Sequence, residues 1–237
     1  MFPQSRRSRL GLAALLVAAP LVELVEGLLS PLTDGSTADD LHAIAAHRSV
    51  FVVSVLAGIV ATVLYVPAFV GLARASWQRS RVLSAVGGSI AVLSMLGFMG
   101  VRMLQAVELE AVNQHLPAGQ AARLVDGAGT NALGSVITGM FLGGSVLGLV
   151  CLGIAAWRAR LAPIAAAVLL IAFPFVDLLA PGHLGTVVSH AVLLIGLAWI
   201  GLSLLRRDHR IGARGHAVSG VSADTNPMIT AGEHAEA

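Results

Sequence analysis

The stretch "LGLAALLVAAPLVELVEGLL" at residues 10–29 decides the fold class of this chain. It runs for twenty residues and carries two ionisable side chains, Glu23 and Glu26. About 20 apolar residues are needed to cross the hydrocarbon core of a bilayer. Lipid offers the backbone no hydrogen-bond partner, so a segment that crosses it must be helical. The stretch therefore predicts a transmembrane helix that contains two carboxylates.

Five further apolar stretches follow, and the whole chain has the composition of a membrane protein. Of its 237 residues, 56% are hydrophobic and 12% are charged, whereas a soluble domain has about 25% charged residues. We predict an all-α, polytopic transmembrane helical bundle with six transmembrane helices in one domain, residues 1–205. The predicted spans are 10–30, 49–73, 82–106, 132–157, 161–180 and 184–205. Residues 206–237 lose the apolar pattern and are predicted to form a disordered cytoplasmic tail.

The start of the chain has two interpretations. Paired arginines before an apolar run, as in "SRRSRLGLAALLVAAP" at residues 5–20, are typical of an export signal. The apolar run continues to Leu29, however, without a convincing A-x-A cleavage site. We therefore interpret this segment as an uncleaved first transmembrane helix.

The arginines predict how the chain is oriented. With the N-terminus inside, the cytoplasmic segments hold twelve arginines, and the outside loops hold only Arg48 and Arg123. Cytoplasmic loops carry such an excess of basic residues, so both termini are predicted to be cytoplasmic. All fifteen basic residues are arginine, and alanine, glycine and valine are abundant, which is typical of a G·C-rich bacterial genome. We expect a multi-pass protein of the bacterial cytoplasmic membrane, with the lipid bilayer as its partner. The basic pI of about 9.5 does not predict nucleic-acid binding, because the arginines lie at helix ends.

The segments between the spans carry local signals. Thr37 and Asp40 have the spacing of a capping box, so the second helix is expected to begin in the first outside loop. The third helix is expected to continue to Leu116, and residues 117–131 are expected to form a polar loop. The glycines of "GMFLGGSVLG" at residues 139–148 have the spacing that lets helices approach closely, which predicts a central position for the fourth helix.

Ionisable residues inside the spans are the main functional lead. At 1.5 Å per residue, Glu23 lies about 20 Å above the inner end of its helix, and Glu26 and Asp177 lie about 24 Å above theirs. Arg102 lies about 30 Å up, and His190 lies about 9 Å below the outer boundary. All five fall in the outer third of the bilayer. The predicted polar layer, extended along the third helix, comprises Glu23, Glu26, Arg102, Gln105, Glu108, Asp177 and His190.

This polar layer has two non-enzymatic interpretations. A charge in hydrocarbon costs about 2.5–3.5 kcal/mol on insertion scales, so the three carboxylates are expected to face inward and to pair, to be protonated or to meet water. Arg102 is the expected positive partner, and His190 can donate a hydrogen bond. The first interpretation is an outward-facing polar pocket for small-molecule transport or sensing. The alternative is a structural or interaction subunit, in which the polar layer only fixes helix packing.

An intramembrane enzyme is the third interpretation. Six helices, the glycine-flanked Ser145 in "GGS" and His190 on the sixth helix are similar to the rhomboid intramembrane proteases. The G-x-S-G motif of that family is absent, because Val146 follows Ser145. Ser145 also lies about 20 Å from the outer end of its helix, whereas His190 lies about 9 Å from it. We therefore predict no catalytic residue.

No metal or cofactor is expected. No pair with a diagnostic metal-ligand spacing occurs among the outer residues Asp39, Asp40, His42, His47, His115 and His183. A b-type haem needs pairs of intramembrane histidines, and His190 is the one clear intramembrane histidine of the sequence. The single cysteine, Cys151, excludes an intrachain disulfide and a cysteine-based metal site.

A second resemblance covers more of the chain. The segment "RVLSAVGGSIAVLSMLGFMGVRMLQAVE" at residues 81–108, the glycine-rich fourth helix and "WRARLAP" at residues 157–163 resemble a family of uncharacterised bacterial membrane proteins. Members of that family have six to seven helices, and their third helix often carries an arginine followed shortly by an acid, as Arg102 and Glu108 do here. The resemblance spans about residues 60–175. It implies a helical bundle in the cytoplasmic membrane and no known activity.

Overall fold

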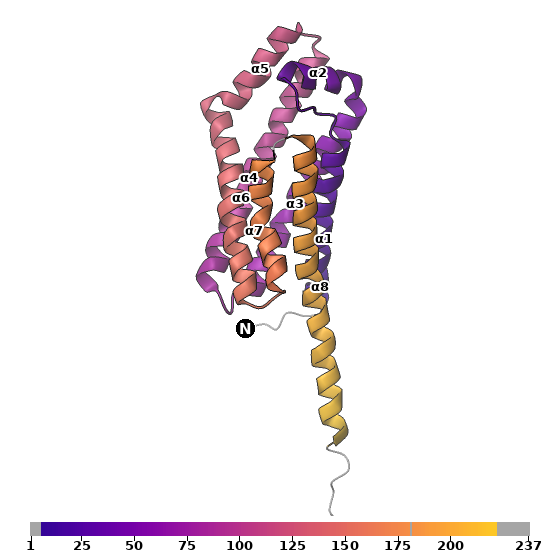
Figure 1. The fold of residues 1–237 in the computed structure, drawn as a ribbon, viewed down its shortest axis with the longest axis vertical. Coiled ribbons are helices and arrows are strands. Elements are labelled where there is room, and N and C mark those ends of the chain that lie inside the picture. Colours follow the sequence, from indigo (N-terminus) through magenta and orange to yellow (C-terminus); the bar gives the residue numbers. More distant parts are fainter. Residues whose placement is uncertain (1–5, 181, 222–237) are drawn as a thin grey trace, which may run out of the picture.

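The computed structural model describes the backbone of residues 6–180 and 182–221, and the side chains of residues 7–180 and 182–206. The described chain contains helices and no strand, and its long helices pack side by side in a bundle (Figure 1). The helices are α1 (Arg6–Leu29), α2 (Thr37–Ala46), α3 (Arg48–Ser76), α4 (Arg81–Asn113), α5 (Ala118–Thr130), α6 (Ala132–Arg158), α7 (Ile164–Leu179) and α8 (His183–Val221).

Five of these helices, α1, α3, α4, α6 and α8, are long and apolar enough to cross a membrane. The prediction of an all-helical chain with several such helices is confirmed, but the number six is not. The segment predicted as the fifth span, 161–180, forms the 16-residue α7, which is about 24 Å long against a hydrocarbon core of about 30 Å. This helix begins late because Arg160 adopts a φ of 52° and Pro163 is the N-cap residue.

Two short helices, α2 and α5, lie at one end of the bundle (Figure 1). We call the end formed by α2, α5 and residues 30–36 the capped end. The capping box of α2 is one residue earlier than predicted: Ser36 Oγ accepts from the Asp39 N–H, and Asp39 Oδ2 accepts from the Ser36 N–H. The helix then breaks at His47, so the predicted second helix is two helices, α2 and α3.

Helix α5 occupies the region predicted to be a polar loop. Helix α4 ends at Asn113 rather than at Leu116, and Pro117 is the N-cap residue of α5. Ala121 of α5 is buried against α2 and α4 in a small apolar cluster with Leu41 and Ala111. The prediction of a loop was wrong because this apolar contact stabilises a helix whose composition is otherwise polar.

Helices α4 and α6 pack backbone to backbone. A Cβ atom added at Gly144 would lie 2.7 Å from Ser94 Cβ, and one added at Gly148 would lie 2.7 Å from the Ala91 nitrogen. Contacts this close require glycine, which supports a central position for this face of α6. Gly139 and Gly143 differ, because a Cβ atom at either would have no atom of the described residues within 4 Å. One of the two glycine pairs on α6 therefore faces away from the neighbouring helices.

Helix α8 is longer than predicted. The last span was expected to end at residue 205, but the helix continues to Val221 and projects beyond the bundle, away from the capped end (Figure 1). Residues 206–221 contain no proline, and four of the sixteen are arginine, a good helix former, so a helix that has already formed can propagate through them despite three glycines. The structure thus describes the first part of the predicted tail, residues 206–221, as a continuation of α8. Its remainder, residues 222–237, lies outside the described residues.

Candidate functional site

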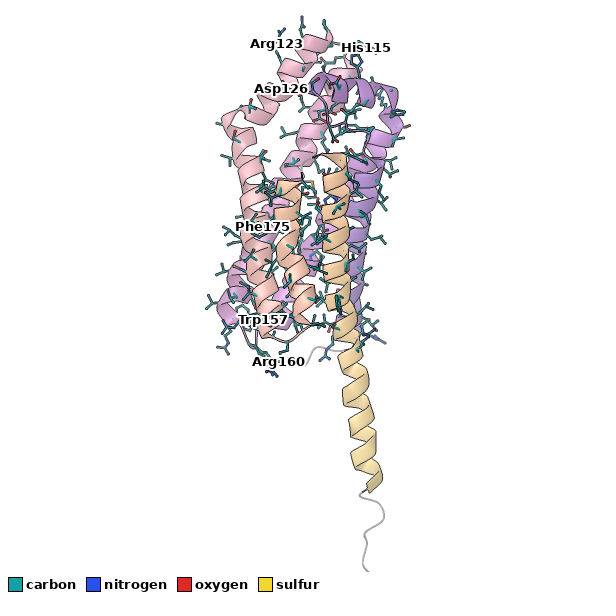
Figure 2. The ribbon with its side chains drawn as sticks, in the orientation of Figure 1. His115, Arg123, Asp126, Trp157, Arg160 and Phe175 are labelled. Carbon is teal, nitrogen blue, oxygen red and sulfur yellow. The ribbon has the colours of Figure 1, made fainter. Side chains whose placement is uncertain are left out.

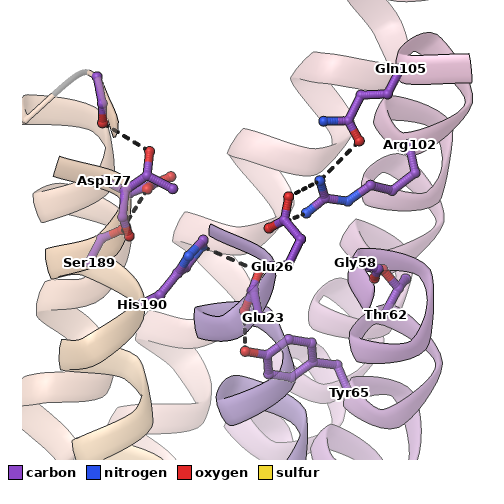
Figure 3. A network of polar contacts seen from close by, with 12 residues as sticks. Glu23, Glu26, Gly58, Thr62, Tyr65, Arg102, Gln105, Asp177, Ser189 and His190 are labelled. Atoms are coloured by element: carbon purple, nitrogen blue, oxygen red, sulfur yellow. Dashed lines mark hydrogen bonds and ion pairs between the residues drawn. The ribbon is translucent and has the colours of Figure 1, made fainter. Parts of the chain in front are cut away.

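The centre of the site is a buried ion pair between α1 and α4. Arg102 Nη1 lies 2.8 Å from Glu26 Oε1, and Nη2 lies 3.1 Å from Glu26 Oε2 (Figure 3). Nη1 also donates to Gln105 Oε1 at 3.0 Å. Glu26 and Arg102 are only 5% and 4% exposed. A fork-to-fork pair of this kind combines strong hydrogen bonds with a fixed geometry, so it holds two helices in register.

The surroundings of Arg102 explain why its side chain can lie inside the bundle. Its guanidinium carbon lies 4.3 Å from the centre of the Phe98 ring, a distance at which a cation is attracted to the ring face. On the other side lies Gly58 of α3, where an added Cβ would be 2.5 Å from Arg102 Nε. The glycine thus leaves the space that the guanidinium needs. Arg102 Nε has no hydrogen-bond partner among the described residues.

Glu23 is the second buried carboxylate of α1, and it has different partners. The Tyr65 hydroxyl of α3 donates to Glu23 Oε2, and His190 Nε2 of α8 lies 3.5 Å from Glu23 Oε1 (Figure 3). Glu23 and His190 are 4% and 7% exposed. His190 Nδ1 is also buried, and it has no partner among the described residues. Glu23 therefore links α1, α3 and α8, and His190 keeps one ring nitrogen free.

Asp177 of α7 does not join the Arg102 pair. Ser189 Oγ of α8 donates to Asp177 Oδ1 at 2.7 Å, which is the one hydrogen bond to this carboxylate in the described part of the chain. The side chain is half-buried rather than buried. The sequence prediction that Arg102 pairs with an intramembrane carboxylate left three candidates, and the structure assigns the pair to Glu26.

A cavity of about 330 Å³ opens between these groups and the capped end. Its ionisable lining residues come from α1, the loop after it, α2, α4, α7 and α8, and they are Glu26, Asp34, Asp40, Arg102, Asp177, His183 and His190. Four carboxylates therefore face one guanidinium, and that guanidinium is already paired with Glu26. The unpartnered His190 Nδ1 belongs to a residue of this lining. With neutral histidines the cavity has an excess of negative charge.

Residues of the capped end hold the mouth of this cavity in shape. Asp34 Oδ1 accepts from the His183 N–H at 2.6 Å. Asp40 Oδ1 accepts from the Thr33 N–H at 2.7 Å and from its hydroxyl at 3.0 Å. Gly182 has a φ of 99°, which favours glycine, and a Cβ atom there would lie 2.7 Å from Asp34 Oδ1. Asp34 and Asp40 thus each use one carboxylate oxygen to accept hydrogen bonds from the segments around the mouth.

Two residues singled out from the sequence lie apart from this cavity. Glu108 of α4 is not part of its lining, and its Oε2 has no partner among the described residues. Ser145 of α6 lines a smaller, separate cavity with Glu23 and Tyr65. No hydrogen bond joins Ser145 to His190 within the described chain, so the described contacts provide no nucleophile–base pair.

Several residues of the site escaped the sequence analysis. Tyr65 and Ser189 are the hydrogen-bond donors to Glu23 and Asp177, and Phe98 and Gly58 enclose Arg102. A lone tyrosine in an apolar helix was the one available signal, because polar groups in such helices need partners. Gly58 gave no signal that distinguishes it from the other glycines.

The site is therefore an acidic cavity with a buried ion pair in its lining. Within the described residues, no group of three or more His, Cys, Asp or Glu side chains is arranged to hold a metal ion. The carboxylates are spread around the cavity rather than converging on one point.

Comparisons with protein-family models, with curated proteins and with solved structures found no match to this chain.

Proposed function

We propose that the chain is a six-span protein of the bacterial cytoplasmic membrane that binds a small organic cation in this cavity, for transport or sensing. In this proposal both termini are cytoplasmic and the cavity opens outward. The observation that carries the proposal is the cavity itself: four carboxylates against one paired arginine, with the free Nδ1 of His190 in its lining. A cation that enters exchanges hydration for charge-assisted hydrogen bonds to the free carboxylate oxygens.

The direction of the helices supports six crossings. Gly27 of α1 lies against His190 of α8, and Gly201 of α8 lies against Ala13 of α1, so these two helices are antiparallel. Helix α7 starts beyond Arg160 and runs toward the capped end, where its Asp177 lines the cavity. A chain that crosses by α1, α3, α4 and α6 needs α7 to return before α8. In this proposal the short α7 is therefore the fifth of six crossings, and α8 is the sixth.

The distribution of arginine supports the orientation. Trp157 and Arg160 lie at the end away from His115, Arg123 and Asp126 (Figure 2). Twelve arginines belong to segments at the Arg160 end or beyond it, and Arg48 and Arg123 belong to the capped end. Reporter fusions after Asp34, Arg79, Asp126, Arg158 and the C-terminus should alternate out, in, out, in, in. An external C-terminus would contradict this orientation.

A structural role is the second candidate function. The bidentate Arg102–Glu26 pair is sealed from solvent, and a buried pair of this kind can serve packing alone. Under this alternative the cavity has no ligand, and the aspartates at its mouth only hold loops. The two candidates differ in whether the cavity discriminates between solutes by charge.

Binding of matched small solutes tests the proposal. The probes are ethylammonium, acetate and ethanol, applied to the purified chain in phosphatidylcholine nanodiscs and followed by calorimetry. We expect ethylammonium to bind and acetate and ethanol not to bind. Asp177→Asn, which keeps an oxygen for the Ser189 hydroxyl, should weaken ethylammonium binding about tenfold, as the loss of one hydrogen bond to a charged group does.

The matched control is Glu110→Gln on α4. This exposed carboxylate accepts from Gln114 and does not line the cavity, so its removal should leave ethylammonium binding unchanged. Equal binding of acetate and ethylammonium, or no binding of any probe, would favour the structural role instead.

A further inference from the structure

A second cavity opens on the outer surface of the bundle between α6 and α7. Its volume is about 300 Å³, and its lining is apolar except at Ser145 and Asp177. Leu142, Leu147 and Leu178 contribute to it and are exposed, with 39%, 58% and 61% of their surface open. In a bilayer this groove faces the acyl chains.

The groove and the polar cavity meet at two side chains. Phe141 of α6 and Asp177 of α7 line both of them. Asp177 Oδ1 accepts from Ser189, and its Oδ2 has no hydrogen bond within the described chain. The carboxylate of Asp177, with one oxygen free of hydrogen bonds in the described chain, therefore borders both the apolar groove and the acidic cavity.

We propose that the ligand is an amphipathic ammonium ion with one alkyl chain, which reaches the cavity from the membrane. Its ammonium binds Asp177, and its chain lies in the groove between α6 and α7. This inference rests on the proposed function, because it names the substrate class of the same cavity. Charge complementarity selects a cation over a fatty acid, because the polar cavity presents four carboxylates and its arginine is paired with Glu26.

The structure also explains how such a groove can stay open. Gly143 lies in its lining, and a Cβ atom there would meet no atom of the described chain within 4 Å. On the adjacent face of the same helix, Gly144 contacts Ser94 of α4. Helix α6 therefore packs closely against α4 and leaves space beside α7. The alkyl chain of the ligand occupies the space that a side chain at residue 143 would fill.

A side chain placed in the groove tests the assignment. Gly143→Leu fills the groove without a clash inside the protein. Gly139→Leu makes the same change one turn away, at a position that is equally open and does not line the groove. Binding of dodecylammonium, ethylammonium and dodecanoate is measured for the wild-type chain and both variants in phosphatidylcholine nanodiscs. Partition into the bilayer is the same for all three proteins, so differences between the variants report the groove.

We expect dodecylammonium to bind the wild-type chain more tightly than ethylammonium does, and dodecanoate not to bind. Gly143→Leu should weaken dodecylammonium binding about tenfold or more, the effect of overfilling a packed space. It should leave ethylammonium binding within about twofold of the wild type. Gly139→Leu should change the binding of neither ammonium ion. Asp177→Asn should weaken the binding of both.

Three results would overturn this inference while leaving the proposed function intact. The first is ethylammonium binding with no effect of Gly143→Leu on dodecylammonium. The second is dodecanoate binding as tight as that of dodecylammonium. The third is loss of dodecylammonium binding when phosphatidylethanolamine replaces phosphatidylcholine, which would assign the site to a bilayer lipid. Failure of both ammonium ions to bind would overturn the proposed function as well.

Discussion

The carboxylates of α1 and the carboxylate of α7 lie at similar heights in the bundle but in different surroundings. Glu23 and Glu26 are 4% and 5% exposed, and each has a charged or ionisable partner on another helix. Asp177 is half-buried, has one hydroxyl partner, and borders two cavities. Removing water from a charge is costly unless a partner replaces it. The sealed carboxylates are therefore suited to holding helices together, and the open one is suited to binding.

The largest effect is expected from removing the partner of a sealed carboxylate. Arg102→Leu leaves Glu26 buried and unpaired, and breaking a buried pair in this way costs about 3–5 kcal/mol. The melting temperature in detergent should fall strongly. Adding Glu26→Leu should restore most of it, because replacing both partners by apolar side chains can be nearly neutral.

The control for this rescue is Asp177→Leu in the Arg102→Leu background. No hydrogen bond or ion pair joins Asp177 to Arg102 in the described chain, so this second change should not raise the melting temperature. Rescue by Asp177→Leu in place of Glu26→Leu would contradict the assignment of the pair. An unchanged stability of Arg102→Leu itself would show that the arginine does not depend on this buried contact.

The next largest effect concerns the two faces of α6. Gly144→Leu places a side chain where a Cβ atom already meets Ser94 at 2.7 Å, and overpacking a tight contact costs about 1–3 kcal/mol. Gly143→Leu, on the open face, should change the free energy of unfolding by less than about 0.5 kcal/mol. Thermal unfolding of the two single variants measures the difference. Equal losses would mean that the groove beside Asp177 is closed.

A smaller effect is expected for the second sealed carboxylate. Tyr65→Phe removes the hydroxyl that donates to Glu23 and leaves His190 as its remaining partner. A buried acceptor that loses a donor costs about 1–3 kcal/mol, and the remaining partner places the change at the lower end of that range. The melting temperature should therefore fall by less than in Arg102→Leu. A stability equal to that of the wild type would mean that water replaces the hydroxyl.

The smallest effect concerns a fully exposed carboxylate outside the spanning helices. The backbone N–H and hydroxyl of Ser36 donate to Asp39 and hold the pKa of that carboxyl below its usual 3.8. A depressed pKa in the folded chain stabilises it above the usual pKa, and this stabilisation is lost as the pH falls through the folded value. The melting temperatures of the wild type and Asp39→Asn should therefore converge as the pH falls below the folded-state pKa of Asp39. A difference in melting temperature that stays constant with pH would contradict a stabilising role for the ionised Asp39 carboxylate in the capping box.

The helical class of the fold was predictable from the sequence, because it depends on composition and on the length of the apolar stretches. Glu26 and Arg102 fall at similar depth by simple counting, and the structure joins them. Counting residues does not give the rotation of one helix about its axis relative to another. The sequence therefore could not choose among Glu23, Glu26 and Asp177 as the partner of Arg102.

Details that depend on tertiary contact were also beyond the sequence. The spacing of small residues fits Gly139 and Gly143 as well as Gly144 and Gly148, yet only the second pair packs against α4. Helix α5 is stabilised by contacts with α2 and α4, which no local pattern reveals. The shortness of α7 follows from the turn at Arg160, whose positive φ has no sequence signature.

The central claim is that the sealed pair supports the fold while Asp177 binds the ligand. It is tested most directly by measuring stability and ethylammonium affinity on the same two variants, Asp177→Asn and the double variant Arg102→Leu with Glu26→Leu. We predict that Asp177→Asn melts like the wild type and binds about tenfold more weakly. The double variant, whose cavity keeps the same net charge, should melt near the wild type and retain its affinity within about threefold. Wild-type affinity in Asp177→Asn, together with lost affinity in the double variant, would contradict the claim.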